Sequence, residues 1–345
     1  MKKITMFLAF VLMLGLLAGC TGDVVVYIND NNCTVGNNDI PAQVGALKTG
    51  LAVVTSVSKS EDAQLAEYDV TLVAVLVDDR GVIADCIIDG IAAKVNFDAT
   101  GKITSNLSAE VKTKNELGDA YGMVSFGNAK YEWNVQAEAL AKFAIGKTVE
   151  ELKNGAIDET GKAPAGTDLA ATATIYLGGY VSAIEKAVAN AKYLGACIGD
   201  RLKLATINSI GSSKDATAEK KGGAQLDSDV IALTVKNDVI TSCYIDSLQA
   251  KVEFDVTGKI TTDLSAQVLT KNELGEAYGM VAYAGAKYEW NEQASRFAIY
   301  VTGKTLQEVV DIAVTEGKPS DAYLSSSVTI AIGGFQALIT KALAE

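Results

Sequence analysis

The stretch TKNELGDAYGM at residues 113–123 returns as TKNELGEAYGM at residues 270–280, with one aspartate exchanged for glutamate. Around it, residues 94–137 align without gaps to residues 251–294, and about three-quarters of the aligned positions are identical. The likeness continues more weakly on both sides, in residues 68–90 and 228–247, and in residues 171–187 and 326–342. Repetition over this length predicts that a whole domain is present twice, rather than a single motif.

The length of 345 residues is enough for about two domains of ordinary size. Apolar residues make up 49% of the chain and charged residues 21%, so each copy has enough apolar residues to bury a core. The expected division is a lipoprotein signal peptide at 1–19, a tether and N-terminal segment at 20–45, repeat domain 1 at 46–193 and repeat domain 2 at 194–345.

Local patterns predict that each copy mixes strands and helices. Residues 70–77 and 82–88 are rich in β-branched side chains and are joined by the turn sequence DDRG. Residues 129–146 have apolar side chains at helical spacing, residues 171–179 alternate like a strand, and residues 180–194 fit an amphipathic helix. Strands and helices do not alternate regularly, which disfavours a doubly wound parallel sheet. The predicted fold class is α+β, with two tandem homologous repeats, each an antiparallel sheet with flanking helices.

The first twenty residues predict export. Lys2 and Lys3 precede an apolar run that ends in Leu-Ala-Gly-Cys20, and this ending resembles the bacterial lipobox. The resemblance implies cleavage before Cys20 and lipidation of its thiol. The expected location is the bacterial cell surface or periplasm, with the protein anchored to the membrane through Cys20 and its domains in water. An ordinary signal peptide or an N-terminal membrane helix is the alternative.

Composition excludes several functional classes. The chain has no histidine, which removes Ser-His-Asp and Cys-His triads and sites with histidine-ligated zinc or haem. The formal net charge of −12 disfavours a nucleic-acid partner, because an acidic surface repels phosphate backbones. No convincing nucleophile–base pair or metal motif is present, so an enzyme acting by itself is not expected.

Cysteine positions do not fix a disulfide pattern. After Cys20 the cysteines are Cys33, Cys86, Cys197 and Cys243, and no CxxC motif occurs. An oxidising compartment would permit disulfides between them. Cys86 and Cys243 fall at matching places in two apolar runs, which favours buried and unreactive thiols there.

The repeated loops and turns offer two kinds of site. Tyr121, Trp133, Tyr278 and Trp290 could stack on a planar ligand, with Tyr131 and Tyr288 nearby and with Glu116, Asp119 and Glu132 as hydrogen-bond acceptors. The alternative is that these aromatic residues anchor a loop against the following helix, with NELG forming its turn. The GKT sequences at 146–148 and 303–305 lack the upstream glycine of a phosphate-binding loop, so we expect a helix stop followed by a capping threonine.

The end of each copy suggests a cofactor. DLAATATIYLGGYVSAIEKAVANA at 168–191 resembles the terminal segment of extracellular FMN-binding domains, in which an SGAT-like motif precedes a helix. VDDRGVIADCIIDG at 77–90 is similar to the opening strand pair of that family. In the family, a flavin transferase attaches FMN to the threonine of the motif through a phosphodiester bond. The resemblance therefore implies Thr174 and Thr329 as attachment positions, although the motif's glycine is replaced in both copies.

Two functions are expected from these observations. The first is a lipid-anchored flavoprotein that binds FMN and exchanges electrons with membrane redox partners in extracellular electron transfer. The second is a noncatalytic surface module that binds a solute, a polymer or a protein partner. In the second case Thr174 and Thr329 are ordinary strand residues.

Overall fold

The computed structural model describes residues 45–344, so the predicted signal peptide, Cys20, Cys33 and nearly all of the predicted tether lie outside the described residues. The elements, with α for helices, η for 3-10 turns and β for strands, are β1 (Ala46–Ser56), β2 (Leu65–Val77), β3 (Ile83–Asn96), α1 (Lys114–Leu117), η1 (Gly118–Tyr121), α2 (Trp133–Ala144), α3 (Val149–Ala156), α4 (Asp168–Thr172), α5 (Gly178–Ala189), β4 (Lys192–Cys197), β5 (Arg201–Ser209), β6 (Gly222–Lys236), β7 (Val239–Phe254), α6 (Lys271–Leu274), η2 (Gly275–Tyr278), α7 (Met280–Ala284), α8 (Trp290–Val301), α9 (Leu306–Val310), β8 (Val314–Thr315), β9 (Lys318–Pro319), α10 (Ala322–Ser325) and α11 (Gly333–Ala344).

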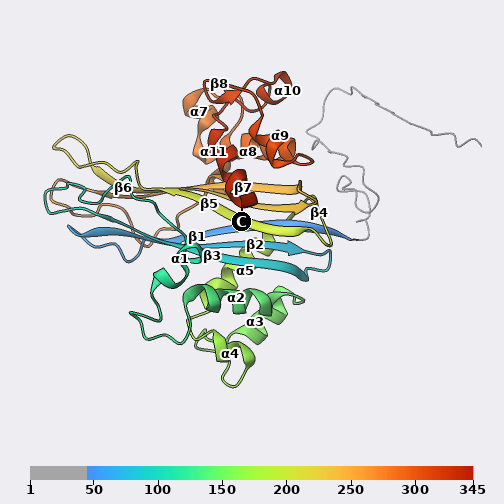
Figure 1. Cartoon of the computed structure of the whole chain (residues 1–345). Coiled ribbons are helices and arrows are strands. Elements are labelled where there is room, and N and C mark those ends of the chain that lie inside the picture. The colour runs from blue at the N-terminus through green and yellow to red at the C-terminus, as the bar shows by residue number, and fades with distance from the viewer. Residues whose placement is uncertain (1–44, 345) are drawn as a thin grey trace, which may run out of the picture.

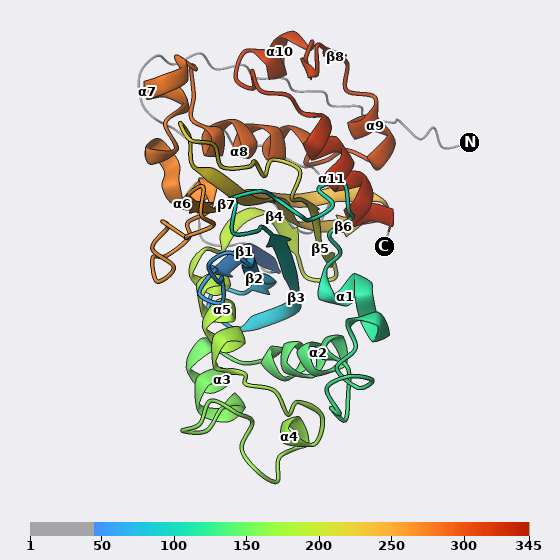
Figure 2. The same ribbon diagram turned by 90° about the vertical axis from the view of Figure 1, so that its left-hand side faces the viewer.

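Two antiparallel sheets form the middle of the molecule. The first sheet has the order β3-β2-β1-β4 and the second has the order β5-β6-β7. Strands β8 and β9 pair with each other in a separate two-stranded sheet. The sheets face one another, helices α2–α5 cover the outer face of the first sheet, and α8, α9 and α11 cover the outer face of the second (Figure 1, Figure 2). The mixed fold with antiparallel sheets and flanking helices is therefore as predicted.

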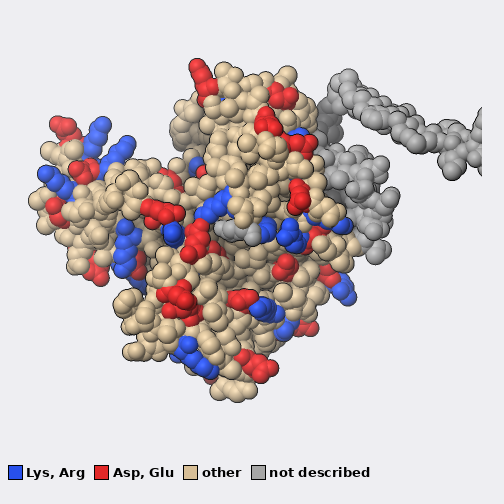
Figure 3. Space-filling view, in the orientation of Figure 1, with Lys and Arg blue, Asp and Glu red and all other residues tan. Residues whose placement is uncertain are grey.

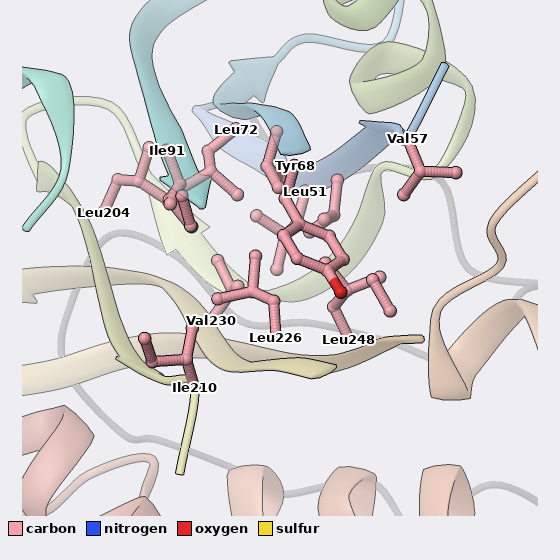
Figure 4. Packing of buried hydrophobic residues seen from close by; sticks show 14 of the residues in the cluster. Leu51, Val57, Tyr68, Leu72, Ile91, Leu204, Ile210, Leu226, Val230 and Leu248 are labelled. Atoms are coloured by element: carbon pink, nitrogen blue, oxygen red, sulfur yellow. The ribbon is translucent and has the colours of Figure 1, made fainter. Parts of the chain in front are cut away.

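The largest apolar cluster lies between the two sheets. Each strand buries alternate side chains there, as the period of two along a pleated strand requires. Leu51, Leu72 and Ile91 from the first sheet lie opposite Leu204 and Leu226 from the second (Figure 4). Two further clusters lie between each sheet and its own helices, so both faces of both sheets are covered.

The two halves of the chain are the two predicted repeat domains, and the interface between them is called the joint here. Aligned residues of the two halves contact one another at the joint. The rings of Phe97 and Phe254 stack with centroids 4.0 Å apart and planes inclined by 2°. The backbone N–H of Ile103 donates to Asp215, and the N–H of the aligned Ile260 donates to Asp62. Such reciprocal contacts are those of a two-fold symmetric interface within one chain.

Glycine is required in two turns where the halves approach each other closely. Gly101 and Gly258 have φ values of +68° and +72° in the turns that follow β3 and β7. A Cβ on Gly101 would lie 2.8 Å from the carbonyl oxygen of Asp255, and one on Gly258 would lie 2.5 Å from that of Asp98. The string FDxTGKIT is therefore repeated because both copies of it build the joint.

Most predicted local elements are present. Residues 70–77 lie in β2, residues 83–88 lie in β3, and the helical spacing in 129–146 corresponds to α2. The helix predicted for 180–194 is α5 as far as Ala189, but residues 192–194 belong to strand β4 instead. The strand predicted for residues 171–179 is wrong. Its first residues end α4, and residues 173–177 form a loop in which Ala173 and Leu177 are buried without a neighbouring strand.

The predicted division at residue 193 falls inside a strand. β4 covers residues 192–197 and pairs antiparallel with β1, which places the start of the second half at the edge of the first sheet. The two halves thus share a strand pairing as well as the core between the sheets.

Candidate functional site

The repeated TKNELG stretch forms a short capped helix in both halves. The Thr113 Oγ1 accepts the N–H of Glu116 at 3.1 Å, and the Glu116 carboxylate accepts the N–H of Thr113 at 2.7 Å. Thr270 and Glu273 form the same capping box. The spacing T-x-x-E is the known signature of a capping box, so this local pattern in the sequence could have predicted both short helices.

The same glutamates join the two halves. Glu273 forms an ion pair of 2.7 Å with Lys186 of α5, and Glu116 forms one with Lys341 of α11. Each lysine comes from the opposite half of the chain and also donates to a strand carbonyl, at Val53 for Lys186 and at Thr206 for Lys341. The repeated motif therefore closes the joint rather than presenting a free carboxylate to a ligand.

A buried aspartate supports each capped helix. Asp89 accepts the N–H groups of Gly90 at 2.7 Å and Asn115 at 3.0 Å, and Asp246 makes the matching bonds in the second half. Burial raises the pKa of Asp89 to about 6 and that of Asp246 to about 6. Desolvation disfavours the charged form, and the hydrogen bonds offset only part of that cost.

These two pKa values predict a pH-dependent contribution to stability. A carboxyl group with a raised folded-state pKa stabilises the fold below its unfolded pKa of about 4, and this contribution is lost as the pH rises through about 6. Relative to Asp89→Asn, the wild-type protein should gain about 1 kcal/mol in unfolding free energy between pH 7.5 and pH 5. Urea denaturation at both pH values measures this difference. Asp119→Asn, at an exposed position, is the control, and an unchanged pH dependence in Asp89→Asn would contradict the prediction.

The predicted aromatic residues surround a lysine. The Lys114 Nζ lies 5.3 Å from the ring centre of Tyr121 and 5.1 Å from that of Trp133. Burial lowers the pKa of Lys114, whose side chain also lies 3.8 Å from an Asp69 oxygen. Lys271 has the same position between Tyr278 and Trp290. These ring faces are occupied by cation–π contacts, so a flavin could stack on them only after displacing the lysine.

The carboxylate of Glu132 fastens the adjoining loop. It accepts the N–H groups of Met123 at 2.8 Å and Val124 at 2.9 Å, and Glu289 does the same for Met280 and Val281. Both glutamates are buried. They are structural acceptors. Because Glu116 is paired with Lys341, Asp119 is the exposed carboxylate that remains among the three predicted acceptors.

Thr174 and Thr329 lie in exposed loops held by a buried glutamine. The Gln136 Oε1 accepts the N–H of Thr174 at 2.8 Å, the N–H of Ile175 at 3.1 Å and the Thr174 hydroxyl at 3.2 Å. The Gln136 Nε2 donates to the carbonyl oxygen of Tyr131. Gln293 makes the matching contacts around Thr329. The side-chain amide of Gln136 thus fixes the loop around Thr174 to the start of α2, and that of Gln293 fixes the loop around Thr329 to the start of α8.

The sequence prediction missed a pair of exposed aromatic residues. Phe126 is 88% exposed and the aligned Tyr283 is 90% exposed. Phe126 lies in a turn after η1, and Tyr283 lies in the short helix α7 after η2. Each ring packs against a glycine of the loop, Gly122 or Gly279. Their aligned aromatic character was visible in the repeated string and could have identified them.

Two cavities lie at the joint between the halves. One, of about 630 Å³, is lined by β3, α1, β5 and Lys341. The other, of about 510 Å³, is lined by β7, α6, α8 and the segment from Lys186 to Leu194. Aligned residues line both, namely Asp89 with Asp246, Thr113 with Thr270, Asn115 with Asn272 and Glu116 with Glu273. Neither cavity includes Thr174 or Thr329.

The cysteines of the described chain are not poised for chemistry. Cys86 and Cys243 are free and buried, and burial raises the pKa of Cys86 to about 12 and that of Cys243 still further. A thiol that stays protonated is a poor nucleophile. Cys197 is disulfide-bonded.

The GKT sequences are structural. Thr148 and Thr305 cap α3 and α9 through capping boxes with Glu151 and Glu308, as the predicted helix stop and capping threonine require. Among residues 45–344, no group of three or more acidic or cysteine side chains is placed to hold a metal ion. Within the same residues, no helix has the length and apolar character needed to cross a membrane.

Comparison with known proteins gives no relative: no protein-family model, no curated protein and no solved structure matches this chain.

Proposed function

We propose that this chain is a lipid-anchored extracytoplasmic flavoprotein made of two homologous domains, each of which carries FMN on a threonine. The domains correspond to residues 46–193 and 194–345, after a signal peptide that ends before Cys20. Bound FMN would supply one- and two-electron transfer, with membrane redox partners as donors and acceptors.

The observation that carries this proposal is the placement of Thr174 and Thr329. Both are exposed, both are fixed by the same arrangement of buried glutamine bonds, and both precede a long helix that begins with two glycines. A rigid, exposed hydroxyl is accessible to a transferase. Attachment would join the threonine oxygen to the phosphorus of FMN, with loss of the hydroxyl proton and departure of a nucleoside monophosphate from a flavin dinucleotide donor.

The surroundings of the threonines suit a phosphate group. Lys130 donates to the carbonyl oxygen of Ala171, three residues before Thr174, and Lys287 donates to Ser326, three residues before Thr329. Helix α5 begins shortly after Thr174 without a side-chain cap, and its first N–H group, that of Gly178, donates to the carbonyl oxygen of Gly161. A nearby ammonium group and a helix N-terminus both stabilise an anion.

The proposal does not include the aromatic residues predicted above to stack on the flavin. Tyr121 and Trp133 face Lys114, and Tyr278 and Trp290 face Lys271. The flavin ring would instead lie outside these loops, against exposed surface.

Intact mass and visible absorbance test the flavin. The mature protein, purified from a host with a flavin transferase, should be yellow and heavier by two FMN groups. Thr174→Ala and Thr329→Ala should each remove one group and about half of the absorbance, whereas Thr172→Ala should remove neither. A colourless protein of unmodified mass that takes up no added FMN would refute the proposal.

The anchor is tested separately. Cys20→Ser should abolish lipid labelling and release the protein from the membrane fraction. If the variant remains membrane-associated and is processed normally, the lipoprotein assignment is wrong, whatever the result for flavin.

A second function is favoured by the cavities at the joint. Matching residues of both halves line them, as expected of a noncatalytic surface module with two related binding sites. This function requires no flavin and would remain if the protein proved colourless.

A further inference from the structure

One strand edge of the second sheet has no partner among residues 45–344. β5 pairs with β6 along one side, and no described strand pairs with its other side. The carbonyl oxygen of Thr206 on that outer side accepts a hydrogen bond from Lys341 of α11. Successive residues of a strand direct their N–H and C=O groups to opposite sides. Those of Leu202 and Leu204 therefore point to the same outer side as those of Thr206.

The corresponding edge in the first half is filled. β4 pairs antiparallel with the start of β1, with Lys192 opposite Thr49 and Tyr193 opposite Lys48. Further along β1, side chains of α5 and the residue after it cover the carbonyl oxygens of Val53 and Leu51, as Lys341 covers that of Thr206. The two edges are thus built alike, and a strand is present on only one of them.

The open edge borders the larger cavity at the joint. Seven consecutive residues, 200–206, line one wall, and alternate residues of β3, namely Asp85, Ile87 and Asp89, line the other. Consecutive residues line a cavity when the strand presents its backbone edge, because a strand face would contribute every second residue. In Figure 3, acidic and basic side chains border the seam where β5 lies in Figure 1. The cavity of about 630 Å³ has room for an extended segment of several residues.

We propose that the outer edge of β5 binds an extended peptide segment of a partner protein by antiparallel strand addition. The partner strand would pair with Leu202 and Leu204 and lie between β5 and β3. Unpaired strand edges bind in this way because backbone hydrogen bonds supply the affinity and alternate side chains supply the specificity.

The β4 strand indicates the sequence that such a peptide needs. Lys48 of β1 lies 5.1 Å from the ring centre of Tyr193 in β4, and Arg201 holds the matching position on β5. Gly195 of β4 is required because a Cβ there would lie 2.2 Å from the carbonyl oxygen of Thr241 in β7. In the first half, Ala84 of β3 holds the position that corresponds to Thr241, so a strand bound beside β5 would face its carbonyl oxygen. The ligand should therefore carry an aromatic residue beside Arg201 and a glycine two positions later.

A peptide with the sequence of β4 is the direct probe. The full-length mature chain, prepared without lipid, is titrated with the capped peptide Ala-Lys-Tyr-Leu-Gly-Ala-Ser, which is residues 191–196 followed by serine in place of Cys197. Amide hydrogen exchange is read by NMR. At saturation, exchange at Leu202 and Leu204 should slow at least about tenfold, because both N–H groups gain a partner.

Two methylated peptides provide the matched control. In β4, Lys192 lies opposite Thr49 of β1, so the N–H groups of the peptide lysine and leucine are the ones that would face β5. N-methylation of these two residues removes those donors and should weaken binding at least about tenfold. N-methylation at the tyrosine and glycine blocks the opposite edge and should leave binding nearly unchanged.

Three results would overturn the proposal. The first is slow exchange at Leu202 and Leu204 in the free chain, which would mean that residues 1–44 or a second copy already cover the edge; sedimentation would distinguish the two. The second is no slowing with peptide. The third is equal binding of both methylated peptides, which would assign recognition to side chains. The proposal is independent of the flavin, since Thr174 and Thr329 do not line the cavity.

Discussion

Phe97→Ala is expected to lower the free energy of unfolding by about 3–5 kcal/mol. Phe97 and Phe254 are almost completely buried, and they stack on each other across the joint. Truncation removes apolar area from the core between the sheets and leaves a cavity that both sheets would have to move to fill. Because the environment of the two rings is nearly symmetric, Phe254→Ala should cost a similar amount.

Denaturant unfolding of the single and double variants measures these effects. The double variant should lose less than the sum of the single losses, since removal of either ring already ends the stack, which is worth about 0.5–1.5 kcal/mol. Tyr283→Ala, at an aromatic residue that is 90% exposed, is the control and should change stability by less than about 0.5 kcal/mol. A loss below about 1 kcal/mol in Phe97→Ala would show that the joint does not depend on this stack.

Gln136→Leu is expected to cost about 2–4 kcal/mol and to loosen the loop around Thr174. The buried side chain accepts the N–H groups of Thr174 and Ile175 and donates to the carbonyl oxygen of Tyr131. Leucine has a similar volume but leaves these three backbone groups without their partner. A buried backbone group without a partner costs more than an ordinary hydrogen bond contributes, so the penalty should be large for a change of similar size.

Stability and amide exchange at residues 173–177 test this expectation. Exchange in that loop should become faster in Gln136→Leu while the loop around Thr329, held by Gln293, remains as in the wild type. Val135→Ala, on the neighbouring exposed position of α2, should have neither effect. If Gln136→Leu keeps wild-type stability, the loop is positioned by other contacts.

Elements with a local cause could be predicted from the sequence. The spacing of apolar residues located α2 and α5, and β-branched runs located β2 and β3. The alternation in residues 171–179 was misleading because the side chain of Gln136, rather than a second strand, accepts the N–H groups of Thr174 and Ile175. A single sequence offers no sign that a glutamine far along the chain will supply those hydrogen bonds.

Long-range pairing explains the other differences. The position of β4 beside β1 depends on how the two halves meet, and local propensity carries no information about it. The same holds for Tyr121 and Trp133. Their positions in the sequence suggested two rings available for stacking, but not that the Lys114 ammonium group lies against both of them. The capping boxes do not depend on long-range pairing. T-x-x-E is a local pattern, so they could have been predicted from the sequence.

The symmetric joint limits how this sequence can change. Phe97 meets Phe254, and the pair Glu116–Lys341 is matched by Glu273–Lys186, so each residue type at the joint must suit both its own half and the opposite one. A new side chain in one copy would meet an unaltered partner in the other, and a compensating change would have to appear in a second place. Single substitutions should therefore be tolerated least at the joint, where one change alters two surfaces that must still fit each other.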